Sequence, residues 1–148
     1  MSSFTNDLTA GAAAYVAAHS AVTLTWTPSG NYSPGAPWPI TVGRMADQGQ
    51  VIAVNAWGGV PDHRLADFMQ PLQFKYRGNG TDSASVNTAA DSVFDVLEML
   101  TDVALNGIHV VKVAMSNSIP LGIDEAGRYM RSDNWFFYCN RPNLGRPL

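Results

Sequence analysis

Residues that could bind a metal are few and scattered in this sequence of 148 residues. Its histidines, His19, His63 and His109, fall on a predicted helix, a loop and a strand, and no two are one helical turn apart. Asp62 and Asp67 stand near His63, but their surroundings are those of a polar loop tip. We therefore expect no metal site.

The sequence contains no arrangement that activates a nucleophile. It has no Gly-x-Ser-x-Gly elbow and no glycine-rich phosphate loop before a helix, and its single cysteine, Cys139, has no histidine paired with it. In the last predicted strand Cys139 is expected to be a small core residue. One cysteine cannot form an intramolecular disulfide, which favours folding in the cytoplasm. We expect neither an enzyme nor a cofactor-binding protein.

A proline-rich stretch from Pro28 to Pro39 predicts a long surface loop that carries Tyr32 and Trp38. The two rings could stack on a sugar, as in a carbohydrate-binding module, or they could anchor a partner protein. Trp26 and Trp57 lie in alternating strand patterns, where packing in the core accounts for them. The loop is therefore a candidate partner contact, with carbohydrate binding as the alternative.

Acidic residues recur at a spacing of three or four on a long predicted helix, opposite its apolar face. They are Asp91, Asp95, Glu98 and Asp102, and the helix has no Lys or Arg. Like charges at this spacing repel one another on a helix. The stripe is either solvated, or lines a channel through which DNA slides, or meets basic groups of a neighbouring copy. The basic groups near the C-terminal end are Arg128, Arg131, Arg141 and Arg146.

The elements that must position these residues begin with a helix from Phe4 to His19. Strands are expected at 22–27, 40–45, 51–57 and 70–77, and a short turn predicts that the second and third form an antiparallel hairpin. In the last of these strands alternate apolar residues point inward and polar residues point outward.

The second half predicts a helix from Ser83 to about Leu105 and strands at 108–115 and 134–140. Between these strands lie a turn-rich segment around Pro120 and a tight turn at 124–127. The expected order is αββββαββ, which indicates an α+β fold with a mostly antiparallel or mixed sheet and two helices packed on it.

Composition predicts a single domain over residues 1–148, with residues 141–148 as an extended C-terminal tail. Charged residues make up 14% of the chain, so much of the surface is neutral or apolar, as in a subunit that is buried between partners. A net charge of −3 gives no basic excess for tight DNA or membrane binding, and no apolar run is long enough to span a membrane.

Several segments of the second half resemble the tail terminator family of long-tailed bacteriophages, whose members are also labelled tail completion or minor capsid proteins. They are Pro71 to Gly78, Ala90-Asp91 with Phe94 to Leu97, Gly122 to Tyr129, and Ser132 to Phe136. In physical terms Gly122 and Gly127 permit a tight turn around Asp124, and Ser132 and Asn134 begin the last strand.

The resemblance implies a structural virion protein that forms a hexameric ring. Such a ring caps the completed tail tube, stops polymerisation of the major tail tube protein, and presents the docking surface for the head-completion or connector protein. DNA would pass through its lumen only as cargo, at the head–tail junction. Another neck or tail-tube protein would share the same composition and the same lack of an active site.

Overall fold

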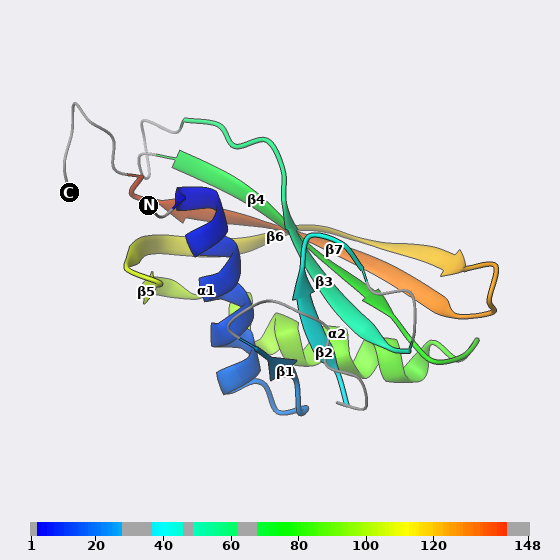
Figure 1. The fold of residues 1–148 in the computed structure, drawn as a ribbon. Helices are drawn as coiled ribbons and strands as arrows, with labels where there is room; N and C mark the ends of the chain where they lie inside the picture. The colour runs from blue at the N-terminus through cyan, green and yellow to red at the C-terminus, as the bar shows by residue number, and fades with distance from the viewer. Residues whose placement is uncertain (1–2, 28–36, 46–48, 62–67, 142–148) are drawn as a thin grey trace.

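The computed structural model describes residues 3–27, 37–45, 49–61 and 68–141, which form one seven-stranded sheet and two helices (Figure 1). Along the chain the elements are α1 (Phe4–His19), β1 (Thr25–Trp26), β2 (Pro39–Val42), β3 (Val51–Ala56), β4 (Phe68–Arg77), α2 (Ala84–Leu97), β5 (Thr101–Leu105), β6 (Ile108–Ile123) and β7 (Tyr129–Cys139). Across the sheet the order is β1-β2-β3-β4-β7-β6-β5. The α+β class is confirmed, with one strand more after α2 than expected.

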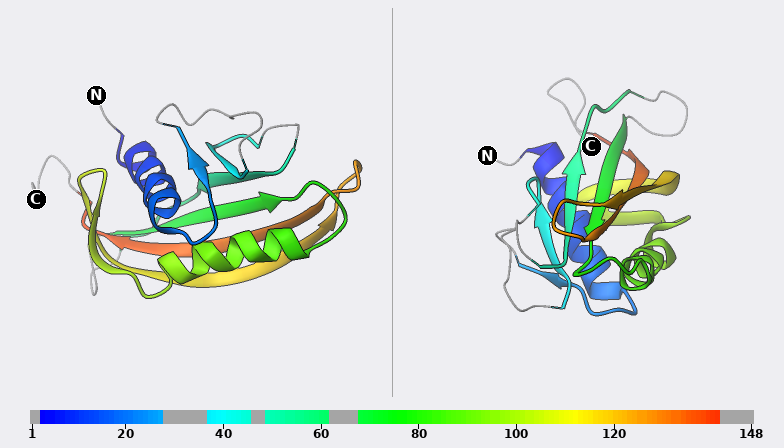
Figure 2. Two further views of the ribbon diagram at one scale, coloured as in Figure 1. Left: turned by 90° about the horizontal axis from the view of Figure 1, so that it is seen from below. Right: turned by 90° about the vertical axis from the view of Figure 1, so that its right-hand side faces the viewer.

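The core lies between the two helices and one face of the sheet (Figure 2). The inward residues predicted for β4, Leu72, Phe74 and Tyr76, are fully buried. Trp135 and Phe137 of β7 share this face, because Trp135 pairs with Leu72 and strand side chains alternate. Both helices contribute their apolar residues to the same cluster.

Helix α1 has the predicted bounds, and it approaches the turn between β5 and β6 closely. A Cβ atom added at Gly11 would lie 3.0 Å from the Cβ of Leu105, closer than ordinary contact, so glycine allows this approach without a shift of the turn. The side-chain amide of Asn106 donates a hydrogen bond to the carbonyl of Asp7 at 3.1 Å. The N-terminal helix is thereby bound to a turn that lies 99 residues later in the sequence.

The first three strands run parallel to one another, which corrects the antiparallel hairpin expected between β2 and β3. Ile40 lies opposite Ile52, and Gly43, with a φ of 82°, takes the chain out of the strand. Residues 43–50 can span up to about 28 Å when extended, which is enough to return along a strand of four residues. Strand β1 occupies only part of the predicted segment 22–27.

Helix α2 ends at Leu97, well before the predicted end, and the following residues form β5 instead. Glu98 is already extended and Met99 has a φ of 62°, so the chain reverses there. The apolar spacing over this stretch satisfies a helix, but Thr101 and Val103 are β-branched and pair with β6. Pairing in the sheet therefore overrides the helical pattern.

Strands β6 and β7 are longer than predicted. β6 continues through Pro120 and Gly122, which were expected to be turn-rich, and β7 begins at Tyr129 rather than near Asn134. The pairing between the two strands shifts register at Pro120 to Gly122. Beyond Val113 no strand in the described part of the chain pairs with the outer edge of β6. A proline is tolerated on such an edge because no ladder hydrogen bond is lost.

Candidate interaction surfaces

The acidic residues predicted to form one helical stripe are divided between different elements. Asp91 and Asp95 are exposed on α2. Glu98 follows the end of that helix, and its carboxylate accepts a hydrogen bond from the backbone N–H of Met115 at 3.3 Å. Asp102 belongs to β5. The prediction of a single acidic stripe was therefore wrong, because α2 ends before Glu98. Only Asp91 and Asp95 share an exposed helical surface.

Two of the four arginines expected to reach a neighbouring copy make ion pairs within their own subunit. The Nε atom of Arg128 lies 2.9 Å from Oδ2 of Asp124. The Nε atom of Arg131 lies 2.9 Å from Oδ1 of Asp133, and its Nη1 is 4.0 Å from a carboxylate oxygen of Asp91. Their charges are therefore already compensated inside the subunit.

A polar network lies beneath α2, and sequence reasoning missed it. Asp133 is fully buried, and Arg131 also donates to the side-chain carbonyl of Asn87 at 3.0 Å. Burial, and then the nearby Asp133 carboxylate, raise the pKa of Tyr76 well above its ordinary value. The alternation of β7 could have predicted that Asp133 is buried, because Asp133 stands two residues before the inward-facing Trp135.

The tight turn between β6 and β7 is held by the side chain of Asp124. Its Oδ1 accepts hydrogen bonds from the backbone N–H groups of Ala126 and Arg128, at 3.0 and 2.9 Å. Gly127 and Gly122 both have left-handed φ values, of 78° and 81°. The Arg128 N–H and its guanidinium lower the pKa of Asp124, because they stabilise the ionised carboxylate against a smaller effect of burial.

Ser132 and Asn134 lie inside β7, not at its start. Ser132 accepts a hydrogen bond from the side chain of Gln73 at 2.9 Å, and Asn134 donates one to the side chain of Asn117 at 2.7 Å. These bonds form a polar ladder across three strands, on the face of the sheet away from the helices.

The tryptophans are placed differently from the expectation. Trp38 is only 5% exposed and belongs to the core, whereas Trp57, expected in the core, is 51% exposed just after β3. Trp26 is half-buried. Tyr32 lies outside the described residues. The buried ring of Trp38 has no open face for a sugar or a partner. Of the two rings predicted to make such a contact, Trp38 is therefore excluded.

The two histidines in the described part of the chain, His19 and His109, lie on different elements and have different partners. The Nδ1 atom of His19 is 2.9 Å from the carbonyl oxygen of Tyr15, and Nε2 of His109 is 2.6 Å from a carboxylate oxygen of Asp102. His63 and its acidic neighbours lie outside the described residues. Within the described ranges no three metal-binding side chains come together.

Cys139 is buried at the end of β7, and burial raises the pKa of its thiol to about 12. A thiol in this state is a small core group rather than a nucleophile.

Neither described helix is long and apolar enough to cross a membrane.

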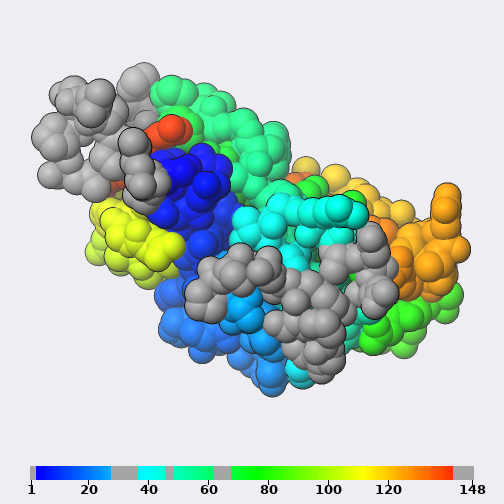
Figure 3. All heavy atoms as spheres, viewed as in Figure 1, coloured from blue at the N-terminus to red at the C-terminus, as the bar shows by residue number. Residues whose placement is uncertain are grey.

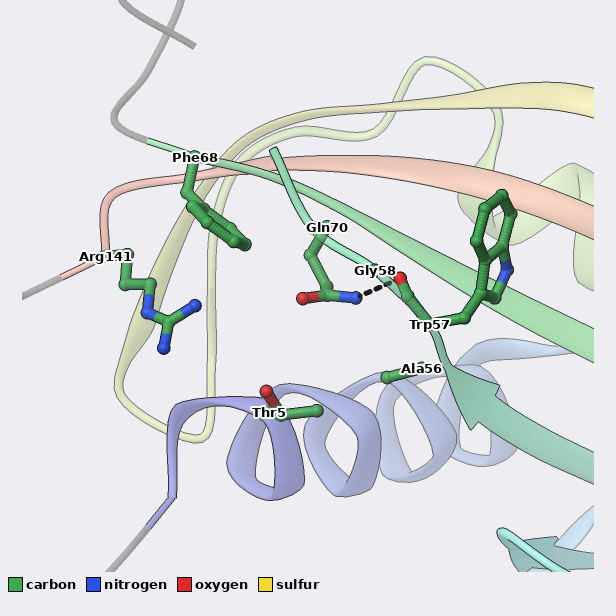
Figure 4. Close-up of a pocket in the computed structure, with 8 residues that line it drawn as sticks. Thr5, Ala56, Trp57, Gly58, Phe68, Gln70 and Arg141 are labelled. Atoms are coloured by element: carbon green, nitrogen blue, oxygen red, sulfur yellow. Dashed lines mark hydrogen bonds between the residues drawn. The ribbon is translucent and has the colours of Figure 1, made fainter. Parts of the chain in front are cut away.

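A hollow of about 230 Å³ opens where the start of α1, the end of β3 and the start of β4 meet (Figure 4). It is lined by Thr5, Ala56, Trp57, Gly58, Gly59, Phe68, Gln70 and Arg141. The guanidinium of Arg141 lies 4.6 Å from the ring centre of Phe68 and 4.7 Å from that of Phe4. Arg146, the fourth predicted arginine, lies outside the described residues.

A run of exposed residues occupies the distal half of β6, Ser116–Ile123, which we call the β6 tip segment. It includes three large aliphatic side chains, Ile119, Leu121 and Ile123, which are 43%, 46% and 55% exposed. In the space-filling view the orange end of the β6–β7 pair projects from the body of the molecule (Figure 3). Exposed apolar side chains gathered on one projection are typical of a protein interface.

Comparison with known proteins identifies the family. Residues 19–137, well over half of the chain, match the family described as bacteriophage tail terminator protein. The fold also matches a chain from the solved structure "Virion of native gene transfer agent (GTA) particle". The TM-score is 0.57 at 13% identity, over 95% of this chain and 100% of that chain. No curated protein sequence matches. The chain belongs to the bacteriophage tail terminator family, a family of structural virion proteins.

Proposed function

We propose that copies of this chain assemble into a closed hexameric ring that caps the phage tail tube. The ring would end polymerisation of the major tail tube protein and present the docking surface for the head-completion or connector protein. Membership of the tail terminator family is the observation that carries this proposal. The subunit would fold in the host cytoplasm and reside at the head–tail junction of the virion, with DNA passing through the lumen as cargo.

A closed ring needs two different surfaces on each subunit, one complementary to the other. The exposed acidic surface of α2, with Asp91 and Asp95, supplies one charged flank. Arg128 and Arg131 form ion pairs within their own subunit, so we propose Arg146 as the cation that faces this flank in the next copy. Asp102 is no longer part of this flank, since it lies on β5.

Tube capping is tested by polymerising purified tail tube protein with and without the chain and measuring tube lengths by electron microscopy. Substoichiometric amounts should stop growth and place a ring at a tube end. Tubes that grow to the same length at every concentration of the chain would contradict the proposed function, whatever the mass of the chain in solution.

The electrostatic part of the interface is tested by comparing Asp95→Asn with Asp102→Asn in ring mass measured by light scattering. Both residues are exposed acids, and asparagine tolerates the left-handed backbone of Asp102. Asp95→Asn should weaken the ring at low salt, and the difference should shrink as salt screens the charges. Equal ring stability in both variants at low salt would remove the acidic surface of α2 from the interface.

A further inference from the structure

An apolar projection and a partly polar hollow stand at opposite ends of this subunit, and the fold of a single subunit accounts for neither. One is the β6 tip segment, with Ile119, Leu121 and Ile123. The other is the hollow at the start of β4, with the exposed Trp57 at its rim. The first is a projection and the second is a depression (Figures 3 and 4).

The β6 tip segment is poorly suited to extending the sheet through its backbone. Two register shifts, at Met115 to Asn117 and at Pro120 to Gly122, interrupt the strand, and Pro120 has no N–H to donate. Irregularities of this kind protect exposed edges from pairing with further strands. A partner would therefore recognise this segment by its side chains.

The apolar side chains of the segment lie on both faces of the strand pair. Ile119 pairs with Ser132, which faces away from the helices, whereas Ile123 pairs with Tyr129, which packs against the core on the helical side. A flat partner surface would cover only one of them. A depression can receive one of these side chains while its rim covers the other, and the hollow, at about 230 Å³, has room for one.

The hollow offers such a depression and is open because of its glycines. A methyl group at Gly59 would lie 2.1 Å from the ring of Phe68, so glycine is needed for the chain to pass this ring. Gln70 is turned inward, and its side-chain amide donates to the carbonyl of Trp57 at 2.9 Å (Figure 4). Phe68 then remains as the apolar wall, whereas the ring of Trp57 is turned away from the hollow (Figure 4).

The geometry of β7 sets the separation of the two surfaces. Cys139, at one end of this strand, pairs with Phe68 of the hollow, and Tyr129, at the other end, pairs with Ile123 of the tip segment. Eleven strand residues rise by roughly 35 Å in total, so the surfaces are too far apart to meet within one subunit. The two surfaces lie at opposite ends of the sheet, as the two ends of β7 do in Figure 2.

The charges beside the two surfaces are complementary. The exposed Glu125 lies in the turn that follows the tip segment, and Arg141 forms part of the hollow. We infer that the β6 tip segment of one copy packs into the hollow of the next copy, with Glu125 near Arg141. The inference rests on the proposed ring, and it assigns the apolar contact that closes it.

The test uses one variant on each surface and a matched control. Leu121→Asp places a charge on the tip segment. Gly58→Glu adds a bulky charged side chain to the lining of the hollow, at a position where an added Cβ atom meets no described atom within 4 Å and the backbone is not left-handed. Met99→Asp is the control, because it changes an exposed apolar residue outside both surfaces and tolerates the φ of 62°. Circular dichroism establishes that each variant is folded.

Light scattering coupled to size-exclusion chromatography should show a ring for the wild type and for Met99→Asp, and monomers of 15.9 kDa for Leu121→Asp and Gly58→Glu. An equimolar mixture of the two monomeric variants should form dimers and nothing larger. Such a pair retains one intact tip segment and one intact hollow that can meet. A contact between two identical surfaces would give no such rescue.

Rings of wild-type mass in both surface variants would overturn the inference and leave the ring itself standing. A mixture that stays monomeric would also overturn it, because the two surfaces would then not be partners. A wild-type chain that is monomeric at every concentration would contradict self-association through these surfaces. In that case the tube-length assay still decides the proposed capping function independently.

Discussion

The guanidinium of Arg131 and the carboxylate of Asp133 lie on the same face of β7, with Nε 2.9 Å from Oδ1. The hydroxyl of Ser118 donates to the same oxygen at 2.6 Å, and Asp133 is fully buried. An arginine that sequence analysis assigned to a subunit interface therefore neutralises a carboxylate inside its own subunit. The number of arginines near the C-terminal end is thus not a measure of the charge available to a partner.

Replacing Arg131 by alanine should lower the free energy of unfolding by about 3 kcal/mol or more, because the buried carboxylate of Asp133 loses its cation. Urea denaturation of the purified subunit measures this loss. Arg128→Ala is the control, since its partner Asp124 lies in a surface turn, and its loss should be clearly smaller. Equal losses in the two variants would contradict the assignment of Arg131 to the interior.

Replacing Tyr76 by phenylalanine should leave the free energy of unfolding unchanged or raise it by up to about 1 kcal/mol. The Tyr76 hydroxyl is buried and has no hydrogen-bond partner among the described residues, whereas its ring fills the core. Thermal unfolding followed by circular dichroism gives the comparison. A clear loss of stability would indicate that the hydroxyl makes a bond that matters for the fold.

Asp124 should make the turn between β6 and β7 sensitive to acid. Its folded pKa is below the ordinary value of 3.8, so its ionised form stabilises the folded state above that value. This contribution is lost as the pH falls through the lower, folded pKa. The stability difference between wild type and Asp124→Asn should therefore shrink between about pH 5 and pH 2, as urea midpoints at several pH values would show. A difference that is constant over this range would contradict the lowered pKa.

Cys139 should resist thiol reagents while the protein is folded. Raising the pKa from 9.0 to about 12 lowers the thiolate fraction at mild alkaline pH by about a thousandfold, and burial also blocks access. Labelling with an aromatic disulfide, followed by absorbance, should be fast in denaturant and very slow in buffer. Fast labelling of the folded protein would show that the end of β7 opens easily.

Local patterns predicted helix α1 and the inward face of strand β4 correctly. The bounds of α1 followed from a capping residue together with helical spacing, and the inward residues of β4 followed from alternation. The predictions failed where a distant strand decided the outcome. The chain after Leu97 has a helical pattern but pairs with β6, and Gly43 lets β2 and β3 run parallel although their connection resembles a hairpin.

The interaction surfaces were less predictable than the fold, because they depend on which residues the sheet brings together. Phe68, Trp57 and Arg141 are far apart in sequence and meet only through the pairing of β3, β4 and β7. Trp38 follows a proline-rich segment that suggests exposure, yet its ring completes the core. Composition indicated that some surface must be apolar, but the sheet determines where it lies.

The contact between Asp7 of α1 and Asn106 has a consequence for synthesis of the chain. The two residues are 99 positions apart, so about 5 to 20 s of translation separate them at ordinary elongation rates. During this time the first helix has been made, but the turn against which Gly11 packs has not. Contacts of such long range slow folding, since a large loop must close before they form. The chain therefore reaches its final structure only after most of it has left the ribosome.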